Sequence, residues 1–205
     1  MQFYHSLDRY KQKNKFLDVR NASQNEFFNF FDLSESDTVR DATTIRTVRN
    51  EVGIKGNLLK LFYNGYFALR HYHMKYNHLP ADTLNLSVYP ATKGNEGYFG
   101  GRMSLRLDSL MEVNGAAEWL LGDNIYRVEG AIRSKWFTAS VKQMTYKPSY
   151  LALAYRGSHD YWENWTDETP IDVSQLNGYL HYKNNVLSLS PGLTFTRLRN
   201  YIYYE

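Results

Sequence analysis

The sequence predicts an all-β protein, an antiparallel meander of about nine amphipathic strands that is part of a transmembrane β-barrel. Apolar and polar residues alternate along most of the 205 residues, and aromatic residues make up 16% of them. Long and short connections also separate to opposite ends of the predicted strands. Alternation with a period of two is typical of strands with two different faces, and aromatic residues favour strands over helices.

The composition narrows the possible classes of protein. No apolar run approaches the roughly 18 residues of a transmembrane helix, whereas the strands of a transmembrane barrel look polar on average. The net charge of +3 is too small for a dedicated nucleic-acid-binding protein. The chain has no cysteine, which excludes disulfides and cysteine-based metal sites.

Three strands are predicted in the N-terminal part of the chain. The first, near residues 3–12, alternates least regularly, whereas the second, residues 47–54, and the third, residues 59–70, alternate clearly. The sequence Lys-Gly-Asn at residues 55–57 predicts a tight turn between the second and third strands.

The clearest alternation lies between residues 98 and 142 and predicts four more strands. Phe99, Met103, Leu105 and Leu107 share one face of the first of these, and the following strands repeat the pattern. Tight turns are expected at residues 108–109, 122–124 and 134–135.

Two C-terminal stretches, residues 175–182 and 187–196, bring the predicted number of strands to nine, with a turn at residues 183–185. The long polar connections all lie at one end of the strands, and most of the tight turns lie at the other end. This layout is typical of outer-membrane barrels. The long connections are residues 14–44, 78–95 and 147–172.

Charged residues on the polar face line up when consecutive strands are paired through their tight turns. Opposite charges on neighbouring strands contribute roughly 0.2–1 kcal/mol per pair. A buried core would not tolerate so many charges, so we expect the charged face to contact water and the apolar face to contact lipid. The predicted pairs are Arg106–Glu112, Glu112–Arg133, Glu118–Arg127 and Glu129–Lys142.

We predict that the residues of the charged face line a pore, and that aromatic residues near the strand ends form rings at the membrane interfaces. The pore-lining candidates are Arg49, Glu51, Lys60, Arg70, Arg102, Arg106, Glu112, Glu118, Arg127, Glu129, Arg133 and Lys142. The aromatic candidates, which lie near predicted strand ends, are Tyr72, Tyr76, Tyr98, Phe99, Trp119, Tyr126, Trp136, Phe137, Tyr201, Tyr203 and Tyr204.

Three histidines raise the question of a metal site. His71 and His73 lie two residues apart on one strand face, and His78 is nearby. Incidental histidines at a water-exposed strand end are far commoner than metal ligands, so no metal and no other cofactor is predicted.

The loop at residues 155–165 offers a second function. Its rings at Tyr155, Tyr161, Trp162 and Trp165 could stack on a sugar, although a loop that packs its own aromatic residues is the simpler interpretation. The alternative to a membrane protein is therefore a secreted or surface β-sandwich that binds glycans through this loop.

Several short stretches share a pattern beyond alternation: DTVR at residues 37–40, TVRNEVGI at 47–54, GGRMSL at 100–105, WFTAS at 136–140, YKPSY at 146–150, WENW at 162–165 and LRNYIYY at 198–204. Together they resemble the "Putative porin" family of β-barrels from Bacteroidota-type outer membranes, over nearly the whole chain. Members of that family are much longer and carry a signal peptide. We therefore expect residues 1–205 to be a single unit, an internal fragment of a larger outer-membrane barrel.

The resemblance implies a protein that is not an enzyme and that lies in the outer membrane of a Gram-negative-type bacterium. It would allow passive passage of small solutes through a polar lumen. Its partners would be outer-membrane lipid, the small solutes and other barrel strands of the full-length chain, with no nucleic acid and no cofactor.

Overall fold

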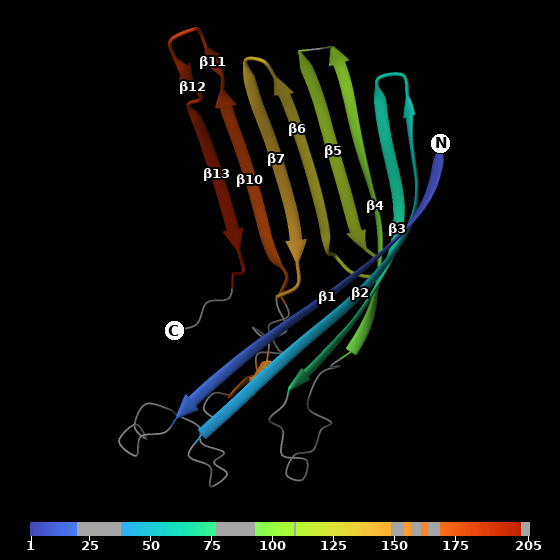
Figure 1. Ribbon diagram of the computed structural model, residues 1–205, viewed down its shortest axis with the longest axis vertical. Coiled ribbons are helices and arrows are strands. Elements are labelled where there is room, and N and C mark those ends of the chain that lie inside the picture. Colours follow the sequence, from blue (N-terminus) through green and yellow to red (C-terminus); the bar gives the residue numbers. More distant parts are fainter. Residues whose placement is uncertain are drawn as a thin grey trace.

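The computed structural model describes residues 1–19, 38–76, 93–108, 110–148, 154–156, 161–163 and 169–201. Nine strands of this part form one antiparallel sheet in which each strand pairs with the next long strand of the chain (Figure 1). The predicted all-β meander is therefore confirmed. The strands are β1 (Gln2–Val19), β2 (Thr38–Leu58), β3 (Leu61–Tyr76), β4 (Lys93–Asp108), β5 (Met111–Leu120), β6 (Tyr126–Ser134), β7 (Phe137–Tyr146), β10 (Ile171–Leu180) and β13 (Gly192–Arg199).

Two short hairpins lie outside this sheet. β8 (Ala154–Arg156) pairs with β9 (Tyr161–Glu163), and β11 (Tyr182–Lys183) pairs with β12 (Ser188–Leu189). The prediction of one continuous strand over residues 187–196 is wrong, because β12 ends before Pro191, which has no N–H for a strand ladder. Within the described residues, no helix is long and apolar enough to cross a membrane.

The first tight turn lies further along the chain than residues 55–57. β2 continues through Gly56 to Leu58, and the chain reverses at residues 59–60, where Leu59 has a φ of 54°. Gly56 lies opposite Tyr63 in the ladder, and the tyrosine ring occupies the space where a Cβ would stand. The glycine therefore accommodates a cross-strand ring and does not mark the turn.

The first four strands are longer than predicted. β1 to β4 contain 18, 21, 16 and 16 residues, whereas β5, β6, β7 and β10 contain 10, 9, 10 and 10. About 9–11 residues suffice for a strand to cross a bilayer. The extra length lies at the end where residues 20–37, 77–92 and 147–170 connect the strands, called the loop end below. The opposite end, where β2 is joined to β3, β4 to β5 and β6 to β7, is called the turn end.

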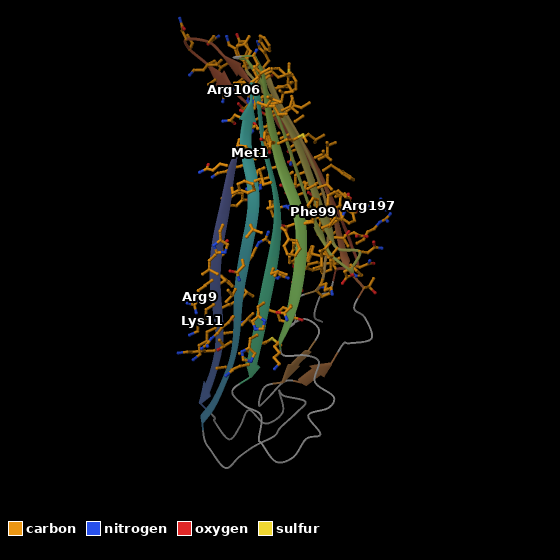
Figure 2. All side chains as sticks on the ribbon, turned by 90° about the vertical axis from the view of Figure 1, so that its right-hand side faces the viewer. Met1, Arg9, Lys11, Phe99, Arg106 and Arg197 are labelled. Carbon is orange, nitrogen blue, oxygen red and sulfur yellow. The ribbon has the colours of Figure 1, made fainter. Side chains whose placement is uncertain are left out.

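The sheet is strongly curved. In Figure 1, β1 and β2 run obliquely to β6, β7, β10 and β13, and Figure 2, turned by 90°, shows β1 at one side of the sheet and β13 at the other. These two strands are the edges of the sheet in the described part of the chain. The molecule therefore has a concave face and a convex face.

Most large apolar side chains lie on the convex face and are exposed. Phe99 is 60% exposed, Met103 61% and Leu193 78%, and all three point to this face by strand alternation. A contiguous apolar surface of this size marks contact with a partner or a membrane. Each strand contributes to it, for example through Phe3, Val52, Phe67, Phe99, Trp119, Val128, Val141, Leu176 and Phe195.

The buried core is small and lies on the concave face. Tyr66, Ala68, Tyr98 and Leu120 are buried there, with Tyr4 packed against them. Ala68 lies opposite Tyr98 in the ladder and is fully buried beneath the side chains around it.

Candidate functional site

The concave face collects the charged residues of the sheet. Alternate side chains of a strand point to opposite faces, and the register of each strand pair then places residues of neighbouring strands on a common face. Of the predicted pore-lining residues, only Lys60 lies outside the strands, in the β2–β3 turn, where its Nζ donates to the Leu107 carbonyl oxygen at 3.0 Å. The residues that share the concave face are Arg49, Glu51, Arg70, Arg102, Arg106, Glu112, Glu118, Arg127, Glu129, Arg133 and Lys142.

The predicted cross-strand register is confirmed at all the proposed positions. Arg106 faces Glu112 across β4 and β5, and Glu112 faces Arg133 across β5 and β6. The other two predicted pairs, Glu118 with Arg127 and Glu129 with Lys142, are also direct partners in the ladder.

The ion pairs only partly follow this register. Glu129 binds both Lys142, at 3.4 Å, and Arg127, at 2.7 Å. Glu118, which was predicted to pair with Arg127, is held by Arg49 at 2.6 Å. Among the described residues, no ion pair joins Glu112 to Arg106 or Arg133. Glu112 accepts a hydrogen bond from the Ser104 hydroxyl at 3.2 Å.

The pair of Arg49 with Glu118 reaches across the curved sheet. Arg49 is on β2 and Glu118 on β5, so β3 and β4 lie between them. Three strand spacings amount to about 14 Å on a flat sheet, and the concave curvature lets the long side chains close that gap. Arg49 also binds Glu51 at 3.2 Å, and the Tyr66 hydroxyl donates to Glu118 at 2.6 Å.

A second cluster adjoins the first on the loop-end side. Arg70 donates through Nε to Glu96 at 2.6 Å, and the Tyr98 hydroxyl donates to the same carboxylate oxygen at 2.6 Å. The Arg49 and Arg70 guanidinium groups lie 5.3 and 5.2 Å from the centre of the Tyr98 ring. Cations over aromatic faces are stabilised by about 0.5–2 kcal/mol.

The sequence interpretation missed the tyrosines of this network. Tyr98 was assigned to an interfacial ring, but it is buried on the concave face, so that assignment is wrong. Tyr72 also points to the concave face, toward Gly94. The aromatic candidates Phe99, Trp119 and Tyr126 are instead direct ladder neighbours on the convex face. Two of the concave tyrosines, Tyr66 and Tyr72, lie opposite glycines, Gly100 and Gly94, whereas Tyr98 lies opposite Ala68 and Leu120.

On the concave face, the cations without an ion pair among the described residues lie toward the turn end. Arg102, Arg106 and Arg133 form no ion pair within the described part of the chain, although Glu112 lies directly opposite Arg106 and Arg133 in the ladder. Arg102 and Arg133 border a groove of about 520 Å³, together with Glu112, Glu129 and Lys142. Further toward the loop end, Glu51, Glu96, Glu118 and Glu129 are each bound by Arg49, Arg70 or Arg127.

Two other predicted features lie near the loop end. The Nδ1 of His71 pairs with the Asn95 side-chain oxygen at 2.8 Å on the convex face. In the loop at residues 155–165, Tyr155 faces Trp162 in the β8–β9 hairpin. The side chains of that hairpin, and all of Trp165, lie outside the described residues, as do Tyr203 and Tyr204.

One comparison with known proteins gives a match. A family model described as "Putative porin" matches residues 1–205. No curated protein and no solved structure matches the chain.

Proposed function

Because the chain belongs to the family described as "Putative porin", we propose that its sheet is a wall segment of an outer-membrane β-barrel through which small solutes diffuse. In this proposal the convex face contacts lipid and the concave face borders a water-filled lumen. The protein carries out no chemical reaction. Further strands that pair with the edges at β1 and β13 would close the barrel.

This proposal rests on the difference between the side chains of the two faces of the sheet. The convex face presents exposed apolar side chains from every strand of the sheet, and the concave face presents ion pairs together with arginines that form no ion pair among the described residues. A membrane barrel with a polar interior needs this distribution. The lengths of β5, β6, β7 and β10 match a bilayer crossing, and short turns with long loops at the opposite end are the usual periplasmic and extracellular layout.

No observation favours the glycan-binding sandwich. A soluble sandwich buries its apolar face against a second sheet. In the part of the chain that the structure describes, the other sheets are two-stranded hairpins, and the convex apolar face is exposed.

Single cysteines can test the proposal, because the chain has none of its own. Val113 and Asn114 are adjacent on β5 and point to the convex and concave faces, respectively. The full-length protein is reconstituted in planar bilayers, and its conductance is recorded while a charged, water-soluble thiol reagent is added.

We expect stepwise conductance for the parent protein. The reagent should change the conductance of Asn114→Cys and leave Val113→Cys unmodified until the membrane is dissolved. Absence of conductance in correctly folded protein, or equal labelling of both cysteines from water, would contradict the proposal.

A further inference from the structure

The convex face carries three cations and a histidine in one row at the loop end. Lys11 on β1 faces Arg46 on β2, Arg46 faces His73 on β3, and His73 faces Lys93 on β4. The four residues, called the cation row below, are therefore direct neighbours on four consecutive strands. Their side chains are exposed, apart from the half-buried His73.

The surroundings of the cation row are basic as well. Arg9, Lys13 and Lys15 on β1 and Lys75 on β3 share this face by strand alternation and are exposed. Among the described residues, neither the cation row nor these surrounding residues form an ion pair or a hydrogen bond with an acidic side chain. On the described convex face of β1 to β4, no residue is acidic.

The clustering of like charges at these positions lowers the stability of the isolated protein. Side chains directly opposite on neighbouring strands have Cβ atoms about 4.5–5.5 Å apart, and like charges there destabilise a sheet. Lysines on an edge strand can be explained as protection against aggregation. That explanation covers Lys11 on β1 and also Lys93, because among the described residues the β4–β5 ladder begins only at Tyr98. It does not cover Arg46, which pairs with β1 on one side and β3 on the other.

The basic surface continues directly from the apolar surface. Leu7, which is 54% exposed, precedes Arg9 and Lys11 at alternate positions of β1 on the same face. With a rise of about 3.3 Å per residue, the first cation lies within ~7 Å of the apolar side chain along the strand. Figure 2 shows Arg9 and Lys11 at the outer side of β1 toward the loop end, with Phe99 nearer the middle of the sheet.

We propose that the cation row binds the phosphate groups of anionic lipid headgroups in the leaflet at the loop end. The inference rests on the proposed membrane insertion. Basic clusters next to a membrane-embedded surface bind anionic headgroups, and phosphate oxygens between Lys11, Arg46 and Lys93 would neutralise their mutual repulsion.

The test compares lipid binding by two variants of equal charge. Lys11→Gln, Arg46→Gln and Lys93→Gln are combined in one protein, and Arg102→Gln, Arg106→Gln and Arg133→Gln in the other. The second triple removes the same three charges from the concave face. Full-length protein in neutral detergent is mixed with phosphatidate or phosphatidylcholine of identical acyl chains, and bound lipid is counted by native mass spectrometry.

We expect the parent protein to prefer phosphatidate. The convex triple should lose at least about tenfold of that preference, since each cation near anionic lipid contributes about fivefold. The concave triple should retain it. Equal loss in both triples, or an unchanged convex triple, would overturn the proposal. Displacement of the lipid by inorganic phosphate at equal concentration would also overturn it, because the site would then hold free phosphate.

A second measurement covers the case in which the triple fails to fold. Lys93→Gln alone removes one member of the row, and in neutral detergent it should unfold at the same temperature as the parent protein or a higher one. Added phosphatidate should stabilise the parent more than this variant. Equal stabilisation of both would argue against the site. Protein that conducts in bilayers yet shows no lipid preference would refute this inference and leave the proposed function intact.

Discussion

Tyrosine rings laid across glycines hold neighbouring strands of this sheet together. Tyr4 faces Gly53, Tyr66 faces Gly100, and Tyr179 faces Gly192. In each pair the ring occupies the space that a Cβ on the glycine would need. A glycine weakens a strand by itself, and an aromatic ring packed over it restores apolar contact.

Gly53→Ala should destabilise the folded protein by about 1–3 kcal/mol, as overpacking does in other tightly packed sites. The new Cβ would lie 2.6 Å from the Tyr4 ring and 2.7 Å from the Gly65 carbonyl oxygen, and the latter is rigid backbone. Urea unfolding in lipid vesicles measures the effect. Gly65→Ala is the matched control, because nothing lies within 4 Å of its added Cβ. The interpretation fails if both variants lose the same stability.

Asp123, in the β5–β6 turn at the loop end, gives a pH dependence that can be assigned to one residue. The Lys147 ammonium donates to its carboxylate, with the two atoms 2.6 Å apart, and this lowers the pKa of Asp123. Because the folded pKa lies below the unfolded value of about 3.9, the stabilisation is present above that pH and is lost as the pH falls through the folded pKa.

The expected size is below about 1 kcal/mol, since the pair is partly exposed. Subtracting the stability of Asp123→Asn from that of the parent protein between pH 7 and pH 3 isolates the contribution. The difference should be constant at the upper end and shrink only in the acidic range. A difference that instead grew toward low pH would mean that the pKa is raised.

At the scale of whole strands, alternation made the register predictable. The turn at residues 122–124 determines which residues of β5 and β6 pair, and it places Glu118 opposite Arg127. Alternation along each strand then determines which side chains share a face. The strand ends were less predictable. Beyond the apolar surface, both faces of β1 and β2 are polar, so the alternation disappears from the sequence while the strands continue.

The ion-pair partners could not be predicted from strand pairing alone. Arg49 meets Glu118 only because the sheet curves, and curvature has no signature in the alternation of β2 or β5. The charged face itself could nevertheless be predicted. Alternation within each strand and the register between strands are enough to decide which residues share a face.

Lipid-facing positions should be intolerant of charge. Leu105→Arg, Val113→Arg and Val128→Arg each lie on the convex face and should cost roughly 2–4 kcal/mol if they are near the bilayer midplane. Arg102→Leu, on the concave face, should change conductance more than folding. Folding free energies in lipid vesicles compare the four variants. Equal costs on both faces would indicate a core packed on two sides.

At the scale of the whole molecule, the charges of the concave face are sorted along its length. Toward the loop end, Glu51, Glu96 and Glu118 are each bound by arginine. Toward the turn end, Arg102, Arg106 and Arg133 form no ion pair in the described part of the chain, and Glu112 is one acid opposite two of these three cations. A solute crossing the proposed lumen would therefore meet a nearly neutral wall and then a positive one.

The barrel should consequently prefer anions weakly. Two unit charges 4 Å apart in water interact by about 1 kcal/mol, which is attractive for an anion and repulsive for a cation. The difference of about 2 kcal/mol limits the anion-to-cation permeability ratio from one such contact to about 30-fold. A Debye length of about 8 Å confines the effect to ions near the wall, so the ratio averaged over the lumen should be well below this limit. The reversal potential of the full-length protein in a planar bilayer under a salt gradient measures the ratio. Replacing Arg102, Arg106 and Arg133 by glutamine should shift it toward cations. The equally charged triple at Lys11, Arg46 and Lys93 should leave it in place, since those side chains lie on the other face. A shift of the same size in both triples would mean that net charge, and not the wall of the lumen, sets the selectivity.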